Sequence, residues 1–180
     1  MDKRAELERR LAELPIVEYG FLKSSEVEFS ERIRTVCETE CPQYGTSWAC
    51  PPAVGTVEEC RERCLAFSDF FVFTTMAEVP DIADMEAALA TRAGHEEITR
   101  EVRGIFRDIY GSCLVLSTES CALCERCGYP EGEPCRFPDH MLPCVESHGI
   151  IVTELAERAG LSYFDDYNTV IWFSVVFFNG

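Results

Sequence analysis

The sequence predicts an α+β fold: a mainly antiparallel sheet packed by helices, with long Cys-rich loops between the elements. Segments with a helical spacing of apolar residues alternate with short runs rich in aromatic and β-branched residues. An apolar content of 47% over 180 residues suffices for one core, and no repeat, linker or shift in composition divides the chain. We therefore expect a single domain over residues 1–180, and a ferredoxin-like arrangement is one topology that these elements can adopt.

The N-terminal segment is expected to form a helix followed by a strand. Residues 2–14 begin with Asp2, a suitable N-cap, and carry one apolar stripe made of Leu7, Leu11 and Leu14. Pro15 ends this pattern. Residues 16–29 partly alternate between apolar and polar side chains, which predicts a strand or a hairpin.

A loop, a helix and a strand are expected next. The stretch from Cys37 to Gly55 is rich in Cys, Pro and Gly, which predicts a loop. Residues 56–67 predict a helix, because Thr56 and Glu59 have the spacing of a capping box. Residues 69–76 have the aromatic and β-branched content of a strand.

The second half is expected to add three helices and two strands. Residues 80–93 predict a helix opened by Pro80 and Asp81, and a second helix ends at Gly111, with its apolar face on Ile98, Val102, Ile105, Phe106 and Ile109. Residues 112–118 predict a strand that leads into a Cys cluster. A helix ending near Gly160 and an apolar strand over 169–178 close the chain.

Charge and hydropathy exclude two classes of function. The net charge is −16, with 32 acidic against 16 basic residues spread along the chain, whereas binding to nucleic acid needs clustered Lys and Arg. The longest apolar run, 169–178, is too short to cross a bilayer, and the charged first residues are unlike a secretory signal. We expect a cytoplasmic protein without a membrane or nucleic-acid partner, whose acidic surface suits a basic redox partner protein.

Four of the 11 cysteines lie close together in the stretch "CALCERCGYPEGEPC". Two residues separate each neighbouring pair among the first three, so that three thiolates in series wrap around an object larger than one ion. A turn-rich segment can then bring the fourth back to the same object. This pattern predicts a [4Fe–4S] cluster held by Cys121, Cys124, Cys127 and Cys135.

The same cysteines have other interpretations. Zinc usually takes two separated C-x2-C pairs, and it remains the alternative metal. A thioredoxin-like dithiol at Cys121 and Cys124 needs a helix directly afterwards, but this segment is rich in Gly and Pro. The odd number of cysteines and a reducing compartment disfavour a disulfide framework.

A second group of cysteines lies in "CETECPQYGTSWACPP". Cys37, Cys41 and Cys50 supply three thiolates in a Pro- and Gly-rich loop, which predicts a second metal or cluster site. Its fourth donor is left open between an exogenous ligand and three further cysteines, Cys60, Cys64 and Cys144. Cys113 and at least one of Cys60 and Cys64 are expected in the core, and His140 and His148 are expected to be loop residues rather than ligands.

The two Cys motifs together resemble the DUF2284 family of predicted metal-binding proteins. The resemblance rests on "CPQYGTSWACPP", "CALCERC", "CRFPDHMLPCVESHGI" and the closing helix and strand, and it covers most of the chain. It implies metal or iron–sulfur binding without an assigned reaction. The resemblance places Cys37, Cys41 and Cys50 in the family's first motif, and it places in the second motif Cys121, Cys124, Cys127 and Cys135. The family pattern has a small residue such as serine at Cys144 and often glycine at Ser120, which argues against a ligand role for Cys144.

Three hypotheses about function follow. The first is an iron–sulfur redox, electron-transfer or accessory protein of anaerobic metabolism, with one [4Fe–4S] cluster and a possible second. The second is a zinc-binding structural or metal-trafficking module. The third is an iron–sulfur enzyme that uses an open coordination position beside Cys37, Cys41 and Cys50.

Overall fold

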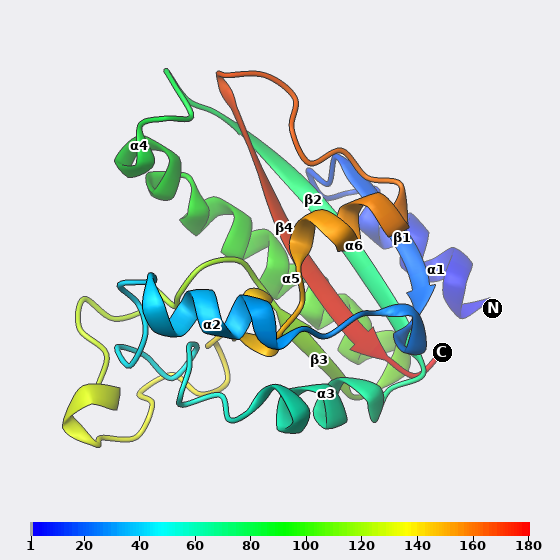
Figure 1. Ribbon diagram of the computed structural model, residues 1–180. Helices are drawn as coiled ribbons and strands as arrows, with labels where there is room; N and C mark the ends of the chain where they lie inside the picture. The colour runs from blue at the N-terminus through cyan, green and yellow to red at the C-terminus, as the bar shows by residue number, and fades with distance from the viewer. Residues whose placement is uncertain (1) are drawn as a thin grey trace.

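A computed structural model describes residues 2–180 and shows a four-stranded sheet in the order β1-β2-β4-β3 (Figure 1). Each neighbouring pair is antiparallel. The strands are β1 (Glu18–Lys23), β2 (Asp69–Glu78), β3 (Cys113–Leu116) and β4 (Thr169–Phe178). Helices pack against this sheet, so the expected α+β class with a mainly antiparallel sheet is confirmed.

The central strands β2 and β4 are apolar on both faces. They pair over their whole length, from Asp69 opposite Phe178 to Glu78 opposite Thr169. Phe70 and Phe71, which point to opposite faces of β2, are both fully buried. A strand that is buried on both sides needs a layer of helices on each side of the sheet, and Figure 1 shows this arrangement.

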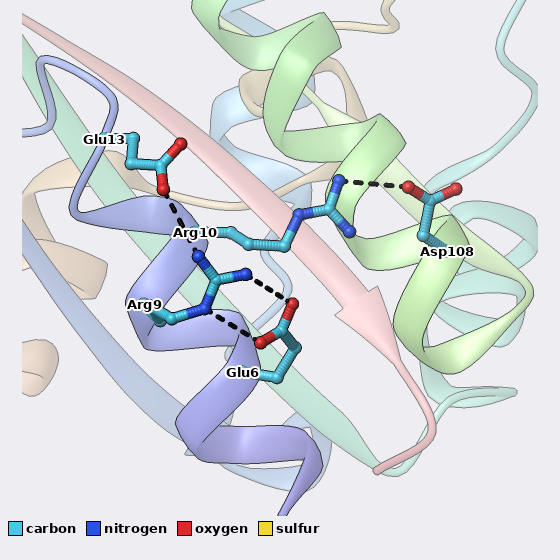
Figure 2. Close-up of polar contacts among 5 residues, drawn as sticks. All are labelled: Glu6, Arg9, Arg10, Glu13 and Asp108. Atoms are coloured by element: carbon cyan, nitrogen blue, oxygen red, sulfur yellow. Dashed lines mark hydrogen bonds and ion pairs between the residues drawn. The ribbon is translucent and has the colours of Figure 1, made fainter. Parts of the chain in front are cut away.

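The first helical layer consists of α1 (Lys3–Leu11), α4 (Met85–Ala90) and α5 (Arg92–Tyr110). Side chains from α1 and α5 form one core with this face of the sheet: Leu7, Leu11, Val102, Ile105, Phe106, Phe71, Phe73, Val176 and Phe178. Figure 2 shows α1 beside α5, where Arg10 Nη2 lies 3.0 Å from a carboxylate oxygen of Asp108. This ion pair is exposed, so the apolar contacts hold the layer in place.

The opposite layer contains α2 (Glu31–Thr39), α3 (Val57–Leu65), α6 (Val152–Ala159) and two short 3₁₀ segments, Ser24–Glu26 and Glu146–His148. A third 3₁₀ segment, Tyr129–Glu131, lies in the long loop after β3 (Figure 1). Its core joins α6, α3 and the segment around Val145 to the other face of the sheet, through Cys64, Val145, Ile150, Leu155, Phe70, Val72, Phe173 and Phe177. Gly149 ends the last 3₁₀ segment with φ +85°, and a Cβ there would come within 2.8 Å of Val57 Cγ1. Glycine therefore allows this segment to pack closely.

Several helix ends lie where the sequence places them. Asp2 accepts from the backbone N–H of Arg4, Thr56 and Glu59 form the capping box of α3, and Gly111 caps α5.

Two expectations about element boundaries were wrong. The loop expected from Cys37 begins later, because Ser30 caps a helix that continues to Thr39, and α4 begins after its N-cap Asp84 rather than at Pro80. In both cases a Ser or Asp side chain that accepts a backbone N–H sets the start.

A buried polar network crosses the interface between α5 and the sheet. His95 is 2% exposed, and its Nδ1 and Nε2 lie 2.8 Å from the hydroxyl oxygens of Thr75 and Ser174, respectively. Ser174 also contacts the hydroxyls of Thr99 and Ser117. Burial lowers the pKa of His95 from 6.5 to about 4, so the folded protein holds this imidazole neutral.

The lowered pKa of His95 predicts an acid-dependent loss of stability. Because the unfolded chain binds this proton more tightly, the stabilisation is complete above pH 6.5 and is lost as the pH falls towards about 4. The free energy of unfolding should drop by about 2 kcal/mol from this group between about pH 7 and about pH 5. Urea unfolding of the reduced, chelator-treated protein at several pH values measures this drop. The free energy of unfolding of His95→Asn should depend less steeply on pH than that of the wild type. Equal pH dependence in the two proteins would contradict the assignment.

Candidate metal sites

Two Cys-rich loops pack against each other beyond the end of β3. We call residues 40–55 the N-terminal Cys loop and residues 117–144 the C-terminal Cys loop; they lie together at the left of Figure 1. Ser47 Oγ lies 2.9 Å from Ser120 Oγ, and Trp48 Nε1 donates to the carbonyl of Glu133 at 3.0 Å. The backbone N–H of Cys144 donates to the carbonyl of Ala49 at 3.1 Å. The loops therefore form one unit, although about 80 residues separate them.

Site I is a cavity of about 330 Å³ in the C-terminal Cys loop, lined by Cys121, Cys124, Cys127 and Cys135. All four cysteines are partly buried. Its remaining wall includes Trp48 of the N-terminal Cys loop, Leu123, Phe137 and Met141. The structure thus brings the four ligands predicted from the sequence to one cavity.

A tight turn returns the chain to site I after Cys127. The 3₁₀ turn ends at Gly132 with φ +73°, and the backbone N–H of Glu133 donates to the carbonyl of Gly128 at 2.9 Å. A Cβ on Gly128 would lie 2.8 Å from Glu133 Cβ, so only glycine fits this close approach. Beside the turn, the sulfur of Cys124 and the carboxylate of Glu133 raise the pKa of Arg136 through hydrogen bonds. The loop therefore places Cys135 and a cationic donor next to the first three thiols.

Site II is a second cavity of about 210 Å³, lined by Cys37, Cys41, Cys50 and Cys144. Cys37 comes from the last turn of α2, Cys41 follows this helix and is exposed, and Cys50 is 4% exposed. The three cysteines predicted from the sequence thus line one cavity. The fourth sulfur in its wall belongs to Cys144, which is 8% exposed.

Backbone hydrogen bonds on both sides place Cys144 in this wall. Ser117, just after β3, forms a parallel β-bridge with Cys144. The N–H of Ser117 donates to the carbonyl of Pro143, and the N–H of Val145 donates to the carbonyl of Ser117. The N–H of Cys144 itself bonds to Ala49, the neighbour of Cys50. The two other donors that the sequence left open, Cys60 and Cys64, face the interior from α3 and are both 0% exposed. Among the three cysteine candidates, only Cys144 lines site II within residues 2–180.

The two sites share a wall. Ser120 and Gln43 line both cavities, and Ser120 directly precedes Cys121. Burial raises the pKa of Cys50, while hydrogen bonds from Ser120 and Ser47 partly oppose this effect. The buried hydroxyl pair of Ser47 and Ser120 therefore contacts a site II thiol from the side of site I.

Four of the site thiols are poor acids in the absence of a positive ion. Burial raises the pKa of Cys37, Cys50 and Cys121, and it raises that of Cys144 well above 9. The thiol of Cys144 donates a hydrogen bond to Glu146 Oε2, with a sulfur–oxygen distance of 3.1 Å. Burial raises the pKa of Glu146 as well. Metal binding to these sites must displace thiol protons, so metal affinity should increase with pH.

Each cavity has four cysteines in its wall, and four thiolates are the ligand set of a [4Fe–4S] cluster and of many structural zinc sites. Within residues 2–180, no three His, Cys, Asp or Glu side chains are already grouped closely enough to hold a metal ion. Arg34 does not line site II but donates to the carbonyl of Ser147, which does, and its Nε is a buried polar atom without a partner in the described chain.

The structure also shows what the sequence could not reveal about the surroundings of the sites. Trp48 stacks edge-on against Tyr129 with ring centroids 4.9 Å apart, and no periodicity marks it as part of site I. His148 is buried, with its Nδ1 2.9 Å from the carbonyl oxygen of Cys144, while His140 is exposed. Neither histidine is among the residues that line site I or site II.

Comparison with known proteins gives one match. The family model described as "Predicted metal-binding protein (DUF2284)" matches residues 20–178, which include every cysteine of both sites. No curated protein and no solved structure matches the chain. No helix within residues 2–180 combines the length and apolar character needed to cross a membrane.

Proposed function

The chain belongs to the DUF2284 family of predicted metal-binding proteins, and we propose that it is an iron–sulfur protein that takes part in electron transfer. Site I would hold one [4Fe–4S] cluster through Cys121, Cys124, Cys127 and Cys135. Site II would hold a second metal centre through Cys37, Cys41 and Cys50. The proposal places the protein in the cytoplasm, as a redox or accessory protein of anaerobic metabolism.

One observation carries this proposal: eight cysteines divide into two cavities, with four thiols around each. Cysteines without a ligand role are normally packed into the core as small apolar side chains, as Cys60 and Cys64 are here. The cysteines of site I instead line a cavity in a loop. Four thiols around one cavity are the ligand set of a [4Fe–4S] cluster, which supplies one-electron redox chemistry when bound.

The surrounding residues have roles that follow from their positions. Trp48, Leu123 and Phe137 limit the access of water to site I, which affects the dielectric around a bound group. Arg136 presents a cationic donor to Cys124, and hydrogen bonds to cluster sulfurs tune the reduction potential. The net charge of −16 would attract a basic redox partner protein and speed its association.

Zinc is the competing occupant, since four thiolates also form the commonest structural zinc site. A zinc-binding structural or trafficking module would use the same cysteines but would carry no labile sulfide and no visible colour. The occupant therefore decides between the two functions.

Purification without oxygen tests the proposal. The protein should be brown, with a broad absorbance that bleaches on reduction, and should contain iron and acid-labile sulfide in equal amounts. A colourless protein with stoichiometric zinc and no sulfide would replace the redox function with the structural one. A protein that takes up neither iron nor zinc would contradict both the redox and the structural function.

A further inference from the structure

Site II lies beside a buried cation that has no anionic partner in the described chain. Arg34 is 7% exposed and precedes Cys37 by three residues in α2, so both lie on one side of the helix. Its guanidinium donates to the carbonyls of Gly55 at 2.7 Å and Ser147 at 2.5 Å, and Nη2 lies 3.9 Å from Cys60 Sγ. Within residues 2–180 its Nε has no hydrogen-bond partner.

A buried guanidinium without a counter-ion is costly. Transfer of a charge out of water is compensated only when an opposite charge or a full set of hydrogen bonds receives it. Carbonyl dipoles alone supply part of this compensation to Arg34. Ser147, which accepts from Arg34, also lines site II, so an anion bound in this cavity would lie close to the guanidinium.

Cys37 of site II lies about one helical turn from Arg34 in α2, so a negative charge at this thiol would lie near the guanidinium. A metal centre ligated by four thiolates carries a net charge of about −2, both for [4Fe–4S]²⁺ and for Zn²⁺, because the four thiolate charges exceed the +2 of the core. Such a centre would supply the anion that Arg34 lacks.

We propose that Cys144 is the fourth ligand of site II and that Arg34 is the buried counter-charge of the anionic four-thiolate centre bound there. This inference rests on the proposed function and extends it, because it makes site II a closed centre. An open coordination position, which an iron–sulfur enzyme of this kind would need, is then absent from site II. Arg34 touches no ligand sulfur of the site in this role and acts as a positioning residue through its charge.

The fourth ligand is tested by metal content. The full-length chain is loaded without oxygen with ferrous iron and sulfide, and Cys144→Ser is compared with Cys113→Ser, a cysteine of β3 outside both cavities. The Cys144 variant should lose about half of the iron and sulfide, while the Cys113 variant should keep all of it. Cys144→Ala and circular dichroism confirm that any loss occurs in a folded protein.

Glu146 is the competing fourth donor, because its carboxylate lies against the Cys144 thiol. Glu146→Gln removes the carboxylate charge and should keep the wild-type iron content. Iron loss in Glu146→Gln but not in Cys144→Ser would overturn the assignment, as would full iron in Cys144→Ser. Failure of the proposed function has a different result, namely a wild-type protein that takes up no iron at all.

The counter-charge is tested by comparing loaded and metal-free protein. Arg34→Met should lower the resistance of site II metal to a chelator about 10–100-fold, while the metal-free protein unfolds at the same or a higher denaturant concentration. Arg34→Lys should restore most of the resistance. The control is Arg32→Met, on the same helix but exposed, which should change neither property. Equal destabilisation of the loaded and metal-free forms by Arg34→Met would show a merely structural role and overturn the proposal.

Discussion

Under the proposal that each site holds one [4Fe–4S] cluster, replacement of both Cys124 and Cys127 with serine is expected to remove about four of roughly eight irons, with the same number of sulfides. Both thiols line site I and neither lines site II. Serine preserves the size of each side chain but is a poor iron ligand at neutral pH, so two lost thiolates should empty the site. Iron and sulfide analysis of the loaded protein measures the effect.

Cys60→Ser and Cys64→Ser are matched controls for this experiment, because both cysteines are buried in α3 away from the two cavities. These variants should keep the full iron content, although each should lose some stability. Complete loss of iron from the site I variant would contradict the expectation that the two sites bind iron independently. It would show that the wall shared through Ser120 and Gln43 makes site II depend on a filled site I.

Phe71→Ala is expected to lower the free energy of unfolding by about 3–5 kcal/mol. Phe71 is 0% exposed near the start of β2, and its ring lies between α5 and the sheet. The ring centroids of Phe21, Phe73 and Phe106 are 4.7, 5.7 and 5.1 Å away. Truncation removes these contacts and leaves a cavity that rigid strands on both sides cannot close.

Denaturant unfolding of the metal-free protein measures this loss. Met76→Ala is the control, since Met76 lies on the same strand but is 44% exposed, and its change should stay within about 0.5 kcal/mol. A loss below about 1 kcal/mol for Phe71→Ala would mean that the neighbouring aromatic rings repack into the space.

The sequence was informative where local physics decides the structure. Caps at Asp2, Thr56 and Gly111 depend on backbone groups a few residues away, and the structure confirms them. The apolar run 169–178 predicts a strand because it is short and rich in Val and Phe, and β4 has these bounds. The strand order β1-β2-β4-β3 has no local signal, since it depends on long-range pairing.

The start of the N-terminal Cys loop shows why one boundary was missed. Pro42 and Gly45 indicate a loop, and that indication extended too far back, to Cys37. Ser30 had the right type for an N-cap, and Ile33, Val36 and Cys37 follow at helical spacing. The helix therefore had a signal, but it is short and mostly polar, so the turn residues outweighed it.

The grouping of cysteines was predictable only in part. Close spacing places Cys121, Cys124 and Cys127 around one object, and the structure gathers them as expected. The position of Cys144 depends on its bridge to Ser117 and its hydrogen bond to Ala49, which join segments far apart in the sequence. The resemblance, which implied a small residue such as serine at this position, argued against a ligand role for Cys144. The burial of Arg34 and the absence of a hydrogen-bond partner for its Nε within the described residues could not be predicted from the sequence either, because both depend on the packing of distant segments.

Native mass spectrometry of the anaerobically purified, full-length protein tests the central claim most directly, because it weighs what each chain carries. The account predicts one dominant species, heavier than the bare chain by two groups of four irons and four sulfides. A species that carries only one such group would leave site II without a cluster. A bare chain, or one heavier only by zinc ions, would contradict the claim that these cysteines hold iron–sulfur clusters.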